Sequence, residues 1–193
     1  MFKHFLTKYG FKESDVLIIP YGSRVYGTHN EKSDYDYLAI VLGGQTGIEY
    51  DWHDINITIY SHKDFQDQLK ECKIHALEAY FHQEIPFYFK LNLGKLRSSL
   101  SEKASHSFVK AKKKIEVGTD YYIGWKSLFH SLRILNFGIQ IGKHGKIVNY
   151  GEANHYWDEI KNANQYNWQY FKAKYQPIYN ELSTEFKKLA PKS

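Results

Sequence analysis

The sequence contains very little of several things. One residue of 193, Cys72, is a cysteine, so no disulfide can form within the chain. A single cysteine fits a reducing compartment. No apolar run approaches the ~20 residues of a membrane-spanning helix. The first residues also lack the apolar block of a signal peptide. These absences predict a cytoplasmic protein with no membrane segment.

What is present is typical of a globular protein. Hydrophobic residues make up 42% of the chain and charged residues 24%. Aromatic residues reach 17%, a high share, and we expect most of them to pack the core. The net charge of +5, with a pI of about 9.0, favours anionic partners such as nucleotides or RNA.

The first half of the chain mixes strand and helix signals. Apolar or alternating runs predict strands at 16–19, 37–42 and 55–59. Short helices are predicted at 2–8, before Gly10, at 24–26, after Ser61 as N-cap, and at 74–81. The sequence therefore predicts an α+β protein, in which residues 1–95 form a domain with a small mixed sheet.

The second half, residues 96–193, is predicted to be a helical domain. A helical period runs from Thr119, the expected N-cap, to Ile141, with Asp120 in its first turn. Gly142 and Gly145 are expected to end this helix. A separate, cationic face of the same helix carries Lys126, His130 and Arg133.

Two aspartates near the start of the second strand carry the clearest chemical signal. Side chains alternate along a strand, so Asp34 and Asp36 point the same way, about 6.6 Å apart along the backbone. Two carboxylates on one face attract a hard divalent cation. The small-residue turn Gly22-Ser23 upstream suits a phosphate chain. Together these residues indicate metal-assisted phosphoryl or nucleotidyl transfer.

The spacing Gly-Ser, ten residues, Asp-x-Asp resembles the signature of the DNA polymerase beta nucleotidyltransferase superfamily. The longer form, Gly-Ser-Arg-x-Tyr-Gly-Thr followed by Ser-Asp-x-Asp, is similar to a bacterial and phage branch of predicted nucleotidyltransferases. In that branch the helical half carries a Lys-x-x-x-His-x-Leu-Arg-like stretch, which here reads Lys126 to Arg133. The resemblance implies a nucleotidyltransferase domain followed by a helical domain.

The resemblance also implies roles for individual residues. Gly22 would let the backbone approach a triphosphate, and Ser23 would hydrogen-bond its outer phosphates. Asp34 and Asp36 would hold Mg²⁺, with Mn²⁺ as the alternative ion. Asp54, at the start of the third predicted strand, would be the third catalytic carboxylate of a two-metal site.

Asp51 is the reserve choice for this third carboxylate. Arg24, Lys126 and Arg133 would neutralise the triphosphate. The resulting hypothesis is an enzyme that moves a nucleoside monophosphate from an NTP to an acceptor hydroxyl, with RNA among the candidate acceptors. The alternative is a catalytically inactive nucleotide- or RNA-binding module, or an antitoxin-like partner, of the same fold.

Each assignment keeps a structural alternative. Gly22-Ser23 is also compatible with a simple turn, and Asp34 and Asp36 with solvated charges that discourage edge pairing. The cationic helix face is equally compatible with a solvated surface. His130 reads as a packing histidine rather than a base.

Overall fold

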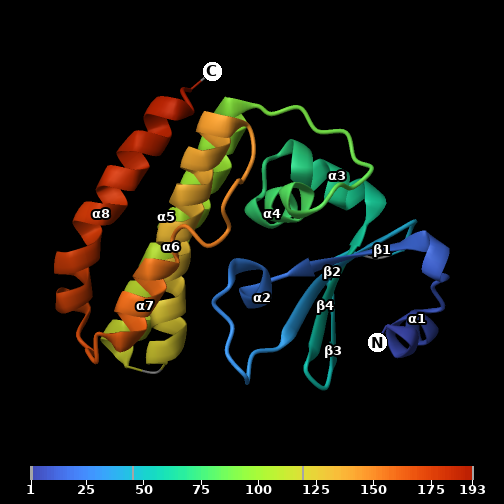
Figure 1. Ribbon diagram of the computed structural model, residues 1–193, viewed down its shortest axis with the longest axis horizontal. Coiled ribbons are helices and arrows are strands. Elements are labelled where there is room, and N and C mark those ends of the chain that lie inside the picture. Colours follow the sequence, from blue (N-terminus) through green and yellow to red (C-terminus); the bar gives the residue numbers. More distant parts are fainter. Residues whose placement is uncertain (1, 45, 119, 193) are drawn as a thin grey trace. The chain divides into compact units, whose positions relative to one another are not determined.

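A computed structural model describes residues 2–44, 46–118 and 120–192, and the α+β class predicted from the sequence is confirmed (Figure 1). The strands are β1 (Val16–Tyr21), β2 (Tyr35–Val41), β3 (Ile48–Trp52) and β4 (Ile55–Ser61). The helices are α1 (Lys3–Tyr9), a 3₁₀ turn (Glu13–Asp15), α2 (Ser23–Tyr26), α3 (His62–Lys70), α4 (Ile74–His82), α5 (Leu93–Val117), α6 (Tyr121–His144), α7 (Asn154–Asn162) and α8 (Trp168–Leu189).

The chain divides into two compact units. The sheet unit comprises Met1–Lys70 and His75–Phe89, and the helical unit comprises Glu71–Ile74 and Lys90–Ser193. In the part of the chain that the structure describes, no helix has the length and apolar character needed to cross a membrane.

The four strands form one sheet in the order β1-β2-β4-β3. β2 and β4 are parallel, and the two outer pairs are antiparallel. Ile55, Ile57 and Ile59 alternate along β4 and are buried on one face, where they join a cluster with Phe5 of α1. This apolar packing fixes the register, because a slip of one residue would move every isoleucine to the other face.

The opposite face of the sheet carries a polar row. Residues opposite one another in neighbouring strands point to the same face. Tyr21 of β1 pairs with Asp36 of β2, Asp36 pairs with Asn56 of β4, and Asn56 pairs with Asp51 of β3. The register therefore lines up one polar residue from each strand. Farther along this face, Tyr60 of β4 stacks on His75 of α4 with ring centroids 5.4 Å apart.

Local signals explain most element boundaries in the sheet unit. Gly10 ends α1 in the left-handed conformation (φ 67°), as predicted. Ser61 Oγ accepts the backbone N–H of Asp64 at 3.1 Å, which caps α3 as predicted. Strand β3 was not predicted, although Ile48, Tyr50 and Trp52 alternate with acidic residues and pair with the isoleucines of β4.

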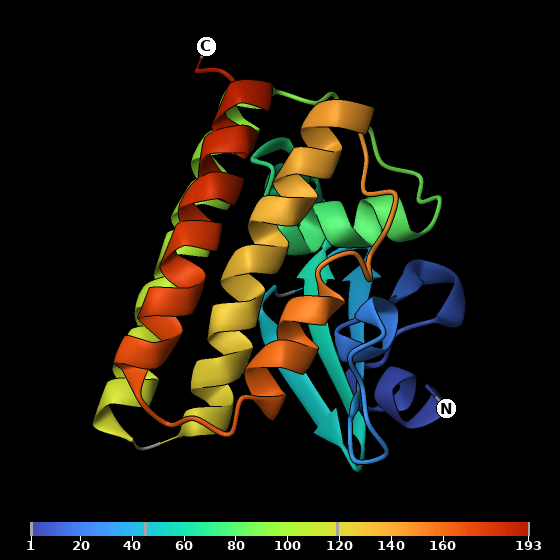
Figure 2. The same ribbon diagram turned by 60° about the vertical axis from the view of Figure 1, so that its left-hand side comes forward.

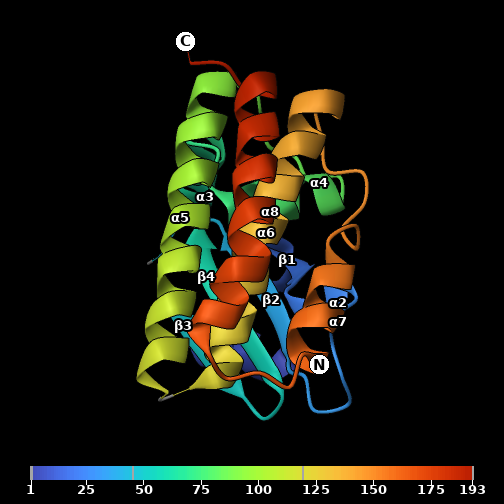
Figure 3. The same ribbon diagram turned by 90° about the vertical axis from the view of Figure 1, so that its left-hand side faces the viewer.

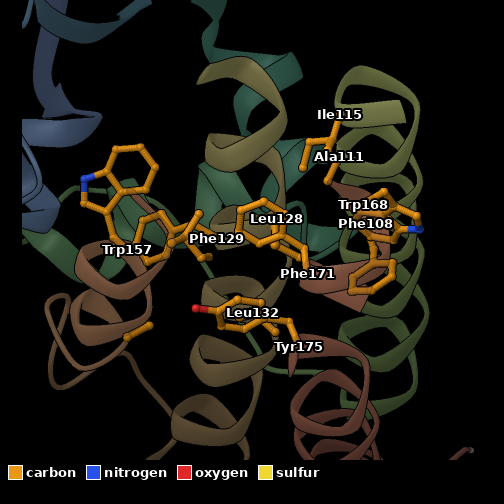
Figure 4. Packing of buried hydrophobic residues seen from close by; sticks show 12 residues of the cluster. Phe108, Ala111, Ile115, Leu128, Phe129, Leu132, Trp157, Trp168, Phe171 and Tyr175 are labelled. Atoms are coloured by element: carbon orange, nitrogen blue, oxygen red, sulfur yellow. The ribbon is translucent and has the colours of Figure 1, made fainter. Parts of the chain in front are cut away.

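In the helical unit, α5, α6 and α8 pack against one another (Figure 2). Helix α7 also packs against α6 (Figure 3). Their shared core is aromatic, with Leu128 and Leu132 of α6 between rings of α5, α7 and α8 (Figure 4). The labelled members include Phe108, Trp157, Trp168, Phe171 and Tyr175.

The bounds of α6 differ from those predicted. Thr119, the predicted N-cap, lies outside the described residues. Asp120 is the N-cap rather than a first-turn residue, since its Oδ1 accepts the N–H of Ile123 at 2.9 Å. The prediction that Gly142 helps to end the helix is wrong. Helix α6 continues to His144, and Gly145 is the C-cap. Gly142 serves packing instead, because a Cβ built there would lie 2.8 Å from Cβ of Leu189.

Candidate functional site

The Gly22 turn and the Asp36 side chain are in direct contact. Gly22 follows β1 with φ 76° and ψ −156°, a conformation essentially limited to glycine. A Cβ built on Gly22 would lie 2.8 Å from Cβ and Cγ of Asp36, and closer still to its carboxylate. Any larger residue would displace the aspartate. The structure thus brings together two parts of the motif that lie 14 positions apart.

Asp34 and Asp36 share one neighbour. Asn56 Nδ2 lies 3.3 Å from Asp34 Oδ2 and 3.5 Å from Asp36 Oδ1, so its amide donates toward both carboxylates. Asn56 belongs to β4, and its partner in the parallel ladder is Asp36. The two carboxylates therefore point to one side, as predicted, and a carboxamide faces them.

Asp54 does not join this pair in a group that could hold a metal ion within the described residues. It lies exposed in the two-residue turn between β3 and β4, where its backbone carbonyl accepts the N–H of Tyr35. The side chain that faces the two aspartates from the neighbouring parallel strand is Asn56, which is a carboxamide rather than a carboxylate.

Asp51, the reserve choice, lies in the polar row of the sheet as the ladder partner of Asn56. It is thus one strand farther from Asp36 than Asn56 is. Across the described ranges, no group of three or more His, Cys, Asp or Glu side chains lies close enough to hold a metal ion. The oxygen donors that converge are two carboxylates and one amide.

Arg24 is engaged with the segment that precedes Asp34. Its Nη2 donates to the carbonyl of Ser33 at 2.8 Å, and its Nε donates to the carbonyl of Asp34 at 3.3 Å. The guanidinium also lies 3.7 Å from the ring centroid of Tyr35. Because three contacts hold one arginine, Arg24 fixes the backbone that presents Asp34. Ser23 begins α2 directly after Gly22 and is half-buried.

A buried carboxylate supports the Gly22 turn from α4, and sequence reasoning missed it. Glu78 is 1% exposed and accepts a hydrogen bond from the Tyr26 hydroxyl at 2.9 Å. Burial, followed by the charge of Glu78, raises the pKa of Tyr21 well above its ordinary value. Tyr21 and Tyr26 flank the turn, so Glu78 joins both ends of it. The available signal was one acidic residue within an apolar helical stretch.

Lys126 and Arg133 belong to the helical unit. Lys126 is exposed, and its Nζ lies 4.8 Å from the ring centroid of Tyr122. Arg133 is 7% exposed and donates through Nη2 to His130 Nδ1 at 2.9 Å. Burial, followed by the charges of Arg133 and two α5 lysines, holds the pKa of His130 well below 6.5. His130 is therefore a neutral hydrogen-bond acceptor for Arg133.

Compared with protein-family models and with curated proteins, the chain matches none. The resemblance of its motif to nucleotidyltransferases stays a prediction.

Proposed function

We propose that this chain is a divalent-cation-dependent nucleotidyltransferase, which moves a nucleoside monophosphate from an NTP to an acceptor hydroxyl. One observation carries the proposal: the Asp36 carboxylate lies against Gly22, with Asp34 at its side. A backbone turn without a side chain, directly beside two carboxylates, suits a phosphate chain that is bridged to the protein by a cation.

The donor set fits one divalent cation. Mg²⁺ and Mn²⁺ prefer oxygen ligands, and Asp34 and Asp36 would supply them. Asn56 would supply a third oxygen by turning its carboxamide, because its amide already faces both carboxylates. A bound cation would offset the charge of the triphosphate and stabilise the charge that develops in transfer.

The proposed reaction is an in-line displacement. The acceptor oxygen forms a bond to the α-phosphorus, and the bond from that phosphorus to the α–β bridging oxygen breaks. Pyrophosphate leaves with the electron pair, and the hydroxyl proton passes to water, which reaches the exposed Asp34. Arg24 acts indirectly, since it holds the carbonyl groups of Ser33 and Asp34 in place.

The test is release of pyrophosphate from each of the four NTPs in the presence of Mg²⁺ or Mn²⁺, with candidate hydroxyl acceptors. We expect Asp36→Ala to abolish release. A matched control is Asp67→Ala, which removes an exposed carboxylate of α3 that pairs only with Lys70 at 3.4 Å among the described ion pairs. Release that survives Asp36→Ala at the wild-type rate would exclude this site.

Asn56 favours a second candidate, a nucleotide-binding module without turnover. A carboxamide cannot accept the proton of an acceptor hydroxyl, whereas a carboxylate can. Calorimetric titration separates the two functions. NTP binding without pyrophosphate release, under every acceptor and cation condition, supports the binding module.

A further inference from the structure

Charge is divided unevenly between the two units. The sheet unit carries 7 Lys and Arg residues against 12 Asp and Glu, a net charge of −5. The helical unit carries 19 against 9, a net charge of +10. The modest net charge of the whole chain therefore conceals one strongly basic unit. A basic unit of this kind attracts a polyanion.

Part of this charge lies along one face of α6, which we call the α6 face. Its residues are spaced at i, i+4, i+8 and i+11, so they lie on one side of the helix, over about 16 Å. In order they are Tyr122, Lys126, His130 and Arg133. Within this face, Lys126 contacts the ring of Tyr122, and Arg133 donates a hydrogen bond to His130.

Two lysines of α5 extend the α6 face sideways. Lys103 and Lys110 are exposed and lie two helical turns apart. Burial and the charge of Arg133, followed by the charges of these two lysines, lower the pKa of His130, and α5 packs along α6. Within the described residues, no carboxylate lies within 4.0 Å of Lys103, Lys110 or Lys126. Three exposed cations are thus available to an external anion.

Exposed rings lie at the end of the helical unit where α6 begins. Tyr122 is 46% exposed and Tyr166 is 52% exposed. The ring of Tyr166 packs edge-on against the ring of Tyr121, with ring centroids 4.9 Å apart. It belongs to an amide-rich segment, Asn162-Ala-Asn-Gln-Tyr-Asn167. Rings of this kind stack on unpaired bases, and amide side chains hydrogen-bond to base edges and to the 2′-hydroxyl of RNA.

We propose that the helical unit binds single-stranded RNA. The phosphates would lie along Lys126 of the α6 face and the two lysines of α5, and unpaired bases would stack on the exposed rings. Combined with the proposed function, on which this step rests, the bound RNA supplies the acceptor hydroxyl. The contacting residues are Lys103, Lys110, Tyr122, Lys126 and Tyr166.

Fluorescence anisotropy tests binding with the full chain and a labelled, unstructured RNA of about 12 nucleotides, within the ~4–16 nucleotides of single-strand sites. No NTP is present. Each phosphate contact adds about 0.7 to the slope of log K against log salt. We expect the double variant Lys103→Gln/Lys110→Gln to lower that slope by about 1.4 and to weaken binding about ten-fold.

The matched control is Lys187→Gln/Lys188→Gln, which removes the same charge from exposed positions of α8. We expect it to change the affinity by less than about two-fold, since these lysines lie off the α6 face. Tyr122→Leu should weaken binding about five-fold or more without changing the salt slope, because stacking does not release counterions.

Several results would overturn the proposal: no binding at low salt, equal losses in the two double lysine variants, or equal affinity for single-stranded DNA or duplex RNA of the same sequence. Failure of the proposed function is a different result. RNA binding without pyrophosphate release under any condition removes the transferase and keeps the RNA site. Pyrophosphate release without RNA binding removes the RNA site and keeps the transferase.

Discussion

The carboxylate of Asp36 occupies the space where a side chain at position 22 would stand. The two residues are in contact because Tyr21, the last residue of β1, pairs with Asp36 across the antiparallel ladder. The chain turns at Gly22, the residue after Tyr21, and this turn lies directly beside Asp36. This contact joins the glycine and the second aspartate of the motif into one site, and it leaves no room for a side chain at position 22.

Gly22→Ala should therefore cost more than backbone strain alone. We expect a loss of at least about 2 kcal/mol in unfolding free energy, together with loss of Mn²⁺ binding, because the new methyl group displaces Asp36. Gly10→Ala is the matched control. Gly10 also has a positive φ, but a Cβ there meets nothing within 4 Å. Its cost should be about 1 kcal/mol. Denaturant unfolding and calorimetric titration measure both effects, and equal costs would argue against the contact.

Asn56→Asp places a third carboxylate opposite Asp34 and Asp36. Without a divalent cation, three like charges repel, so we expect a lower melting temperature at neutral pH than in the wild type. Mn²⁺ should restore the melting temperature and bind more tightly than to the wild type. Asn56→Ala removes the donor without adding charge, and it should show no gain in Mn²⁺ affinity. A variant Asn56→Asp indifferent to Mn²⁺ would contradict the proposed cation position.

Tyr26→Phe removes the hydroxyl that donates to the buried Glu78 carboxylate. We expect a loss of about 1–3 kcal/mol, because the buried Glu78 carboxyl group loses one hydrogen-bond donor while the ring packing is kept. Denaturant unfolding gives the magnitude. Tyr170→Phe, at a partly exposed tyrosine of α8, is the control and should be neutral. If both variants unfold alike, Glu78 does not depend on this hydrogen bond.

His130 should make the protein less stable in mild acid. Its folded-state pKa is held below 6.5 by burial, Arg133, Lys103 and Lys110, so below pH 6.5 the unfolded state binds a proton that the folded state does not. Stability contributed by neutral His130 is thus present above pH 6.5 and is lost as the pH falls toward the folded-state pKa. The variant His130→Gln should flatten the stability profile in this window. A stability profile that keeps its wild-type slope in this window in His130→Gln would contradict this role of His130.

Gly138→Ala should destabilise the helical unit, although alanine favours helices over glycine by about 1 kcal/mol. A Cβ at position 138 would lie 2.7 Å from the buried ring of Phe186 in α8. Thermal unfolding should show a lower midpoint, and Phe186→Leu in the same chain should partly restore it by making room. A midpoint raised by Gly138→Ala alone would show that the two helices separate easily.

Much of the fold was predictable because local signals agree with the tertiary packing. Ser61 begins α3 and Gly10 ends α1 as capping chemistry requires, and the isoleucines of β4 alternate as a half-buried strand should. Strand β3 was missed, although its alternation is visible in the sequence. The extension of α6 through Gly142 was not predictable, because only the contact with Leu189 explains that glycine.

The candidate site was predictable in part. The spacing placed Asp34 and Asp36 on one side, and the shared contact with Asn56 bears this out. The third position depends on the register between two strands that lie apart in sequence, and a local pattern does not specify it. Glu78 was missed for a similar reason, since only the packing of α4 brings it to Tyr26.

The boundaries of the two units have a consequence for dissection of the protein. The chain crosses between the units three times, because the short segment Glu71–Ile74 belongs to the helical unit while His75–Phe89 returns to the sheet unit. A single protease cut after residue 89 would leave a piece of the helical unit, including the buried Cys72, on the other fragment. The two units are interleaved in sequence, so neither can be excised intact as one continuous fragment.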